Sequence, residues 1–367
     1  MKSLLSKISH SLFHHLTWKG YWEPLVQRFK PAWRDGLFRA QITSATYLNP
    51  NTLQILLSPE KKWPVHLAGQ HVSLTLEING RLTTRVFTIA SGASTRALEN
   101  ELRLIIRIKE QGALTPHLPT LSLGQWVNIS SPMGRFALRE DKDILMIAGG
   151  SGITPFIAML EDYTSKHAAK HSSNDCNEHH SRQASMKPNI HLLYYAKQGE
   201  HLLIDELSNI SSKLPNFAFR LLTKANDGDV ERYLPEFNSY EWMVCGPQSL
   251  YGPVSKNALA NNISLESEHF TALLPTVFDS SEEEQTFLIQ HDDKVLHVNN
   301  QQSLLTQLQQ ANVSVNYGCG MGICHQCQCV KKQGIVRDMR TGELSDNAEE
   351  LIQLCVSQAI TNLELQS

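Results

Sequence analysis

The sequence lacks the features that would place a chain across a membrane or along a nucleic acid. No stretch of its 367 residues approaches the roughly 18 consecutive apolar residues of a membrane-spanning helix. Lys and Arg (33) nearly balance Asp and Glu (36), which argues against a protein that coats nucleic acid. Lys7 and His10 interrupt the N-terminal apolar residues, so no signal peptide is expected. We therefore expect a cytoplasmic protein without a transmembrane segment.

Acidic side chains are scarce at the start of the chain, where residues 1–34 hold Glu23 against six Lys and Arg. Apolar residues recur there at the spacing of one helical face; they are Leu4, Leu5, Ile8, Leu12, Phe13 and Leu16. The opposite face carries more Ser and His than Lys, which favours a helix packed on the body of the protein. The alternative is a basic, amphipathic lead-in that touches a membrane or a membrane-bound partner.

Cysteine is rare outside one short segment, and this clustering favours metal binding over disulfides. Cys319, Cys324 and Cys327 have the C-x4-C-x2-C spacing of plant-type [2Fe–2S] centres. Cys355 is the expected fourth ligand. A zinc knuckle is the alternative, but it would normally show two separate CxxC-like pairs. Cys329 is interpreted as a small buried side chain.

Hydrophobic periodicity divides the chain into parts. Between 35 and 140, short strands separated by turn residues predict an antiparallel barrel or sandwich, with strands at 38–47, 52–57, 70–78, 85–90, 102–109 and 125–130. From 141 to 275, strands alternate with helices, which predicts a parallel sheet with covered faces; two of the helices are expected at 204–213 and 248–261. The polar segment 165–189 is interpreted as a mobile insertion.

The last part, 285–367, begins after a joint at about 275–285. We expect a hairpin over 286–298 and a helix over 303–313 before the cysteine loop. From residue 281 onward the chain holds 11 acidic and 5 basic residues, a net charge of −6. Such a surface suits a basic partner, and a merely solvated acidic face is the alternative.

A glycine-rich turn follows the first strand of the α/β part, in the sequence MIAGGSGITPF at 146–156. Thr154 is expected to cap the helix that follows, and Pro155 suits the first turn of that helix. The free N–H groups at such a helix start favour a pyrophosphate.

Together with RVFT at 85–88 and GALT at 112–115, this turn resembles the ferredoxin–NADP reductase superfamily over residues 36–275, and residues 285–367 resemble a plant-type ferredoxin. The resemblance implies a multidomain protein. Its parts would be an antiparallel β-barrel flavin domain (35–140), an α/β parallel-sheet NAD(P)H-binding domain (141–275) and an α+β (β-grasp) ferredoxin domain (285–367).

The resemblance also implies flavin-binding residues. Arg85 would hold flavin phosphate, the ring of Phe87 would stack near the flavin, and Thr88 would hydrogen-bond near flavin N5. Phe87 stands where the family usually has Tyr, so one hydroxyl contact is missing. The phosphate turn comprises Lys109, Gly112, Ala113, Leu114 and Thr115. This turn favours FAD over FMN.

For the nucleotide, the resemblance carries over two loops and an acidic residue. The loops comprise Gly149, Gly150, Gly152, Ile153, Thr154 and Pro155, and then Cys245, Gly246 and Pro247. Cys245 would lie beside the nicotinamide, and Glu268 would point toward the flavin. Lys197 and Lys224 follow consecutive strands and favour NADPH over NADH.

The implied activity is electron transfer from NADPH through the flavin to the [2Fe–2S] cluster and on to an oxygen-using acceptor protein. The domain order resembles the phthalate dioxygenase reductase and phenylacetyl-CoA oxygenase reductase group. The lead-in with tryptophans and basic residues resembles the electron-transfer partners of membrane-bound fatty-acid (stearoyl-CoA) desaturases, so a peripheral position at the membrane is the alternative to a purely cytoplasmic location. The alternatives are a reductase for a Rieske-type or diiron oxygenase, and a redox-sensing binding protein.

Overall fold

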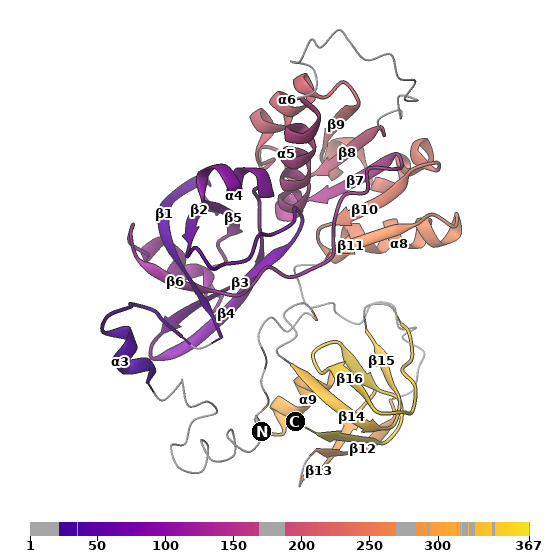
Figure 1. Cartoon of the computed structure of the whole chain (residues 1–367). Helices are drawn as coiled ribbons and strands as arrows, with labels where there is room; N and C mark the ends of the chain where they lie inside the picture. The colour runs from indigo at the N-terminus through magenta and orange to yellow at the C-terminus, as the bar shows by residue number, and fades with distance from the viewer. Residues whose placement is uncertain are drawn as a thin grey trace, which may run out of the picture. The chain divides into compact units, whose positions relative to one another are not determined.

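The computed structural model describes residues 22–34, 36–168, 188–268, 284–291, 294–313, 315, 317, 322, 327–339 and 342–366. The chain divides into two compact units, residues 1–268 and 269–367, coloured indigo to orange and orange to yellow in Figure 1. The helical face expected within residues 4–16 and most of the insertion expected at 165–189 lie outside the described residues. No helix of the described ranges is long and apolar enough to cross a membrane.

The described end of the lead-in leaves apolar side chains in solvent. It contains the five-residue helix α3 (Glu23–Gln27), which has no side-chain N-cap. Trp22, Leu25 and Phe29 are 42%, 56% and 81% exposed. Farther along, Arg34 Nη2 lies 2.7 Å from Glu77 Oε2 and ties the lead-in to the barrel.

Six antiparallel strands form the first sheet of unit 1, in the order β4-β3-β6-β1-β2-β5. They are β1 (Phe38–Asn49), β2 (Thr52–Pro59), β3 (His71–Ile78), β4 (Arg81–Thr88), β5 (Leu102–Arg107) and β6 (Trp126–Ile129). The sheet closes where Ile89 and Leu104 form an antiparallel bridge. The helix α4 (Ala93–Glu99) and the 3-10 helix η1 (Thr115–Thr120) lie in its connections. The expected strands and the antiparallel barrel are confirmed.

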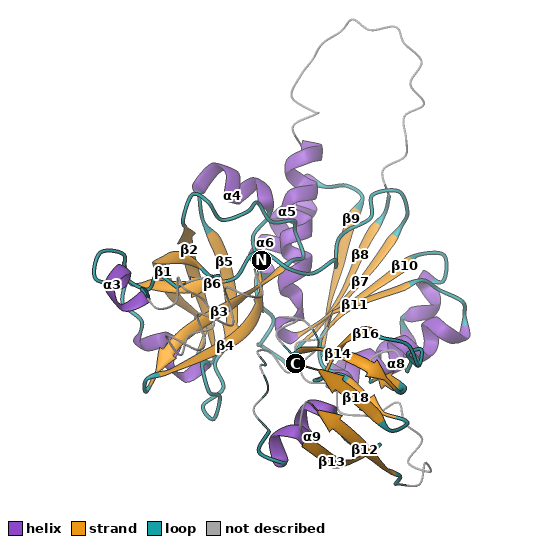
Figure 2. Ribbon diagram, turned by 60° about the horizontal axis from the view of Figure 1, so that its bottom comes forward, coloured by secondary structure: helices purple, strands orange, loops and turns teal. Residues whose placement is uncertain are grey.

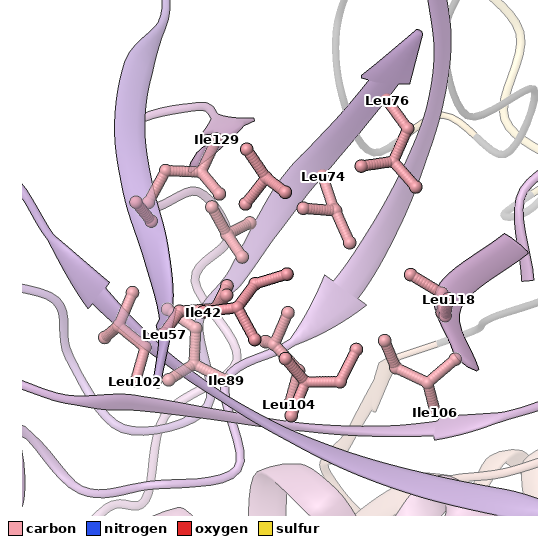
Figure 3. Packing of buried hydrophobic residues seen from close by; sticks show 14 of the residues in the cluster. Ile42, Leu57, Leu74, Leu76, Ile89, Leu102, Leu104, Ile106, Leu118 and Ile129 are labelled. Carbon is pink, nitrogen blue, oxygen red and sulfur yellow. The ribbon is translucent and has the colours of Figure 1, made fainter. Parts of the chain in front are cut away.

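The barrel core is built from alternate residues of these strands, because successive side chains of a strand point to opposite faces. In β2, for example, Leu53, Ile55 and Leu57 are at most 2% exposed. Figure 3 shows such side chains meeting inside the barrel, Leu104 and Ile129 among them. Each buried Leu or Ile contributes about 1.5–3 kcal/mol. The packed core therefore holds in place the strands of the barrel, including the strand that ends in the RVFT motif.

The second sheet of unit 1 is parallel, in the order β11-β10-β7-β8-β9. Its strands are β7 (Ile144–Gly149), β8 (Ile190–Tyr195), β9 (Phe217–Leu222), β10 (Glu241–Cys245) and β11 (Leu265–Glu268). Helices α5 (Thr154–Ala168) and α6 (Ile204–Lys213) lie on one face and α8 (Gln248–Ala260) on the other (Figure 2). The short helices α7 (Lys224–Asp227), η2 (Gly150–Ile153), η4 (Val230–Arg232) and η5 (Leu234–Phe237) complete this part.

The strand order reverses between β7 and β10, and this position defines a binding crevice. In open parallel sheets, ligands bind outside the carboxyl ends of the strands where the order reverses. Helix α5 continues to Ala168, so residues 165–168 of the segment interpreted as an insertion are helical. The parallel sheet itself, covered on both faces, is confirmed.

Arg103 of β5 joins the barrel to the nucleotide part of unit 1. Its guanidinium donates to Glu161 Oε1 of α5 at 2.6 Å and to Glu206 of α6 at 2.8 and 2.9 Å. Burial raises the pKa of Glu161, and the Arg103 charge opposes this rise. Next to Glu161, Asp162 accepts the backbone N–H groups of residues 93 and 94 at the start of α4. Arg103 therefore neutralises two carboxylates where the barrel and the nucleotide part meet, and the Asp162 hydrogen bonds add to this junction.

Replacing Arg103 by methionine is expected to destabilise unit 1 by about 2–3 kcal/mol, because it leaves two carboxylates without their cation at a mostly buried junction. Arg220→Met is the matched control, since Arg220 pairs with Glu236 where both side chains are nearly half exposed. That exposed pair is expected to contribute less than about 1 kcal/mol. Thermal unfolding measures both variants, and equal losses would contradict the assignment.

The second unit has a mixed sheet in the order β13-β12-β18-β14-β16 and a two-stranded sheet of β15 and β17. Its elements are β12 (Thr286–His291), β13 (Lys294–Asn299), α9 (Leu304–Gln310), β14 (Gln328–Gln333), β15 (Val336–Asp338), β16 (Glu350–Gln353), β17 (Ser357–Ala359) and β18 (Leu363–Gln366). β12 and β18 run parallel, and the other paired strands run antiparallel. The expected hairpin and helix are confirmed, and the joint expected at 275–285 lies almost entirely outside the described residues.

Candidate functional site

Two loops meet at the carboxyl ends of β7 and β10. A Cβ on Gly152 would lie 2.0 Å from the carbonyl oxygen of Cys245, and one on Gly149 would lie 2.7 Å from Cδ of Pro247. The backbones of the loops therefore touch, and glycine is required for this contact. A Cβ on Gly246 would likewise lie 3.1 Å from the backbone of Gly149, so this glycine belongs to the same contact. The structure thus brings the two predicted nucleotide loops together.

Between these contacts the glycine loop faces open space. Gly150 has φ +56°, and a Cβ there would meet no atom within 4 Å. Thr154 was expected to cap α5, but its hydroxyl donates to the carbonyl of Ser151 at 3.0 Å. The side chains of Ile153 and Pro155 are buried. The loop consequently offers backbone groups at the helix start, as a pyrophosphate site requires.

Cys245 and Glu268 are neighbours at the ends of β10 and β11, where they are register partners. Cys245 is completely buried, and burial, together with the Glu268 charge, raises the pKa of its thiol well above the ordinary value. Cys245 is therefore a neutral thiol at physiological pH. Burial also raises the pKa of the Glu268 carboxyl, and a hydrogen bond from His71 opposes that rise.

On the barrel side, β4 presents the RVFT motif. The Thr88 side chain is 4% exposed, and its Oγ1 has no hydrogen-bond partner within the described part of the chain. Phe87 is half-buried, and Arg85 Nη1 donates to the carbonyl of Thr84 at 2.7 Å. An unpartnered buried hydroxyl is costly unless a ligand satisfies it. Thr88 therefore fits a group that would accept or donate a hydrogen bond at this position.

The predicted phosphate turn is closed by its own hydrogen bonds. Thr115 Oγ1 accepts the Lys109 N–H at 3.0 Å and donates to the Lys109 carbonyl at 3.1 Å, and a Cβ on Gly112 would come within 2.6 Å of that Oγ1. Lys109 and Gly112 line an open pocket of about 510 Å³. Leu114 is fully buried in the barrel core, so only its backbone can contact a ligand, whereas Ala113 is exposed.

The two lysines expected to select NADPH lie in the connections after β8 and β9. Lys197 is exposed and lies in a turn whose N–H at residue 200 donates to its carbonyl. Lys224 begins α7, and its Nζ lies 2.7 Å from Asp229 Oδ1. The Lys224 side chain is highly exposed. The Lys224 ammonium therefore already has an acidic partner in this structure.

In unit 2, two of the four predicted cluster ligands lie side by side. The sulfurs of Cys327 and Cys355 are 3.1 Å apart, and the Gly322 N–H donates to the Cys355 sulfur at 3.0 Å. Cys319 and Cys324 lie outside the described residues. Cys329 is 3% exposed in the same hydrophobic core, as expected of a small buried side chain. Adjacent thiols with an N–H aimed at sulfur fit an iron–sulfur cluster.

His71 is a residue of the site that the sequence did not reveal. Its Nδ1 lies 3.0 Å from Glu268 Oε1, and both side chains are buried. The ring packs on Gly134, where a Cβ would come within 2.8 Å of it. The sequence signal was only a histidine at the start of a predicted strand, which usually indicates an ordinary core position.

Three family models match the chain. They are the oxidoreductase FAD-binding domain over 40–138, the oxidoreductase NAD-binding domain over 146–255 and the 2Fe-2S iron-sulfur cluster binding domain over 287–359. FAD, NAD(P)H and a [2Fe–2S] cluster are thus the cofactors of these domains.

Two curated proteins and a solved structure are similar to this chain over most of its length. The NADPH oxidoreductase of Mycobacterium tuberculosis is 22% identical over 340 residues, covering 90% of this chain and 84% of the relative. The toluate 1,2-dioxygenase electron transfer component of Pseudomonas putida is 27% identical over 240 residues, covering 62% of this chain and 64% of the relative. The structure of phthalate dioxygenase reductase matches with a TM-score of 0.55 and 20% identity, covering 90% of this chain and 98% of that one, and shows the shared fold.

Proposed function

We propose that this chain, an NAD(P)H-dependent electron-transfer reductase, serves a membrane-bound fatty-acid desaturase. It belongs to the ferredoxin–NADP reductase family and has the FAD-binding, NAD-binding and 2Fe-2S domains of the phthalate dioxygenase reductase-like architecture. NADPH is the proposed electron donor. The observation that carries the choice of acceptor is the exposed apolar and basic lead-in before the barrel.

The residues of the chain have distinct proposed tasks. When bound, the cofactors supply hydride acceptance and one-electron transfer, and the protein supplies orientation and electrostatics. Arg85 and the 109–115 turn hold the FAD phosphates, while Thr88 hydrogen-bonds the ring system. The backbone of the 149–154 loop binds the nucleotide pyrophosphate. The neutral thiol of Cys245 packs beside the nicotinamide without adding charge. Lys197 and Lys224 receive the 2′-phosphate.

The lead-in supports a membrane-surface location. Leu25 and Phe29 are 56% and 81% exposed, and Arg28 and Lys30 flank Phe29 in the sequence. Apolar side chains that enter the lipid boundary contribute about 1.5–3 kcal/mol each when fully buried. Basic side chains beside them add attraction to anionic lipids. The combination fits a peripheral contact with an anionic bilayer, close to a membrane-bound acceptor.

The test is co-sedimentation with vesicles that contain anionic lipid. Leu25→Ser combined with Phe29→Ser is expected to weaken binding by roughly 100-fold, since about 3 kcal/mol is lost. Leu98→Ser is the matched control, because Leu98 is 87% exposed on α4, away from the lead-in. The proposal also requires that wild-type protein reconstitute stearoyl-CoA desaturation with a membrane desaturase. Undiminished vesicle binding by the double variant would overturn the role of the lead-in.

A soluble Rieske-type or diiron oxygenase is the second candidate acceptor. The similarity to the toluate 1,2-dioxygenase electron transfer component favours it. Capture of such an oxygenase by the wild-type protein, with no desaturation in the reconstituted membrane system, would select this candidate. A redox-sensing binding protein would instead fail the stopped-flow test, in which NADPH should bleach flavin and cluster together.

A further inference from the structure

We propose that His71 is a positioning residue for Glu268, and that the two side chains form one buried hydrogen-bonded pair that shares a single proton. The inference rests on the proposed function in one respect, namely that Glu268 faces the site where NADPH and FAD react. The residues lie 197 positions apart, one on the barrel strand β3 and one at the end of β11.

The pair lies between the two halves of the site. His71 is the register partner of Thr88 across β3 and β4, and Glu268 is the register partner of Cys245 across β10 and β11. Gly134 fixes the back of the imidazole ring, because any side chain at that position would collide with it. The hydrogen bond therefore connects β3, the neighbour of the strand that carries Thr88, to β11, the neighbour of the strand that carries Cys245.

Each residue of the pair has a second polar side-chain atom that takes no part in their shared hydrogen bond. His71 Nε2, Glu268 Oε2 and Thr88 Oγ1 are buried, and none has a hydrogen-bond partner among the residues that the structure describes. Buried polar atoms are normally satisfied, so unpartnered ones on three residues that are joined by strand register and by a hydrogen bond indicate a bound group or ordered water. The two side chains that bind each other through Nδ1 and Oε1 thus each keep a second polar atom, Nε2 and Oε2, for a ligand.

The charge of the pair follows from its burial. Side chains that are 5% and 8% exposed cannot hold an uncompensated charge at small cost, so the pair retains one proton and stays net neutral. The titratable group that faces it from β10 is Cys245, which is itself neutral, while β4 contributes Thr88 and residues 133–134 contribute backbone groups. Within the described residues, His71 is therefore the side chain whose hydrogen bond opposes the rise in the pKa of the Glu268 carboxyl.

The experiment follows the protonation of Glu268 by infrared spectroscopy of the oxidised holoprotein, with Glu268→Gln identifying its carboxyl band. His71→Leu removes the imidazole and is expected to produce a protonated carboxyl band near neutral pH that wild type lacks. His71→Asn keeps a donor near the position of Nδ1 and guards against a folding failure. It is expected to keep the hydrogen bond but to raise the titration midpoint of the band by at least about one pH unit.

A second readout is the pH profile of flavin bleaching by NADPH. Its midpoint is expected to shift in His71→Asn by the same amount as the infrared midpoint. An unchanged Glu268 titration in folded His71→Asn and His71→Leu protein would overturn the proposal. The infrared result needs neither NADPH nor an acceptor, so it stands apart from any failure of the desaturase or membrane assays.

Discussion

Replacing Cys355 by serine is expected to reduce NADPH-driven cytochrome c reduction to background while ferricyanide reduction continues. A [2Fe–2S] cluster needs four thiolates, and the Cys355 sulfur lies 3.1 Å from that of Cys327. Loss of one thiolate removes the one-electron carrier of unit 2. The residues predicted to bind flavin and nucleotide belong to unit 1 and are untouched, so the flavin can still pass its two electrons one at a time to two ferricyanide ions.

Cys329→Ser is the matched control for that variant. Cys329 is buried in the same core as Cys327 and Cys355, so its substitution imposes a comparable packing change. It is expected to retain cluster absorbance, iron content and cytochrome c reduction. Cys324→Ser should behave like Cys355→Ser. Retained cytochrome c activity in Cys355→Ser, or a cluster lost equally in Cys329→Ser, would show that the ligand assignment is wrong.

Much of the fold followed from local patterns. The helix expected at 204–213 coincides with α6 (Ile204–Lys213), and β1 (Phe38–Asn49) exceeds its expected range by two residues. Apolar alternation and turn residues specify such elements because each pattern spans only a few neighbouring positions. The start of the insertion was misplaced, since residues 165–168 are helical although the segment 165–189 as a whole has the polar composition of a loop. Local helix hydrogen bonds there outweigh composition.

The site could be predicted where the spacing of glycine or cysteine residues in the sequence reflects a geometric requirement. It could not be predicted where residues that are far apart in the sequence form a pair. The contact between Gly152 and Cys245 follows a pair of motifs that the sequence displays. By contrast, the bond between His71 and Glu268 joins residues from different sheets, and no periodic signal indicates which buried polar groups meet. The ion pair of Lys224 with Asp229 was missed for a related reason, because a charge pattern does not say whether a cation has a partner. The ligand roles of these residues stay predictions.

Gly152→Val is expected to eliminate bleaching of the flavin by NADPH and to lower the melting temperature of unit 1. A Cβ at residue 152 would lie 2.0 Å from the Cys245 carbonyl oxygen and 2.6 Å from its carbon. Both are backbone atoms, so no side-chain rotation relieves the clash and the two loops must separate. Overpacking of this kind costs about 3 kcal/mol. The corresponding fall in melting temperature is roughly 6–12 °C for a unit of this size.

Gly252→Ala separates this effect from the general sensitivity of the nucleotide part to change. Gly252 lies within α8, and a Cβ there meets no atom within 4 Å, so alanine is expected to stabilise the helix by about 1 kcal/mol. The bleaching rate of that variant should equal that of wild type. If Gly152→Val instead keeps its bleaching rate, the contact between the two loops does not shape the nucleotide site. If it loses bleaching without losing stability, the valine blocks the ligand directly and the loops have not moved. The two measurements together therefore distinguish a displaced loop from an obstructed site.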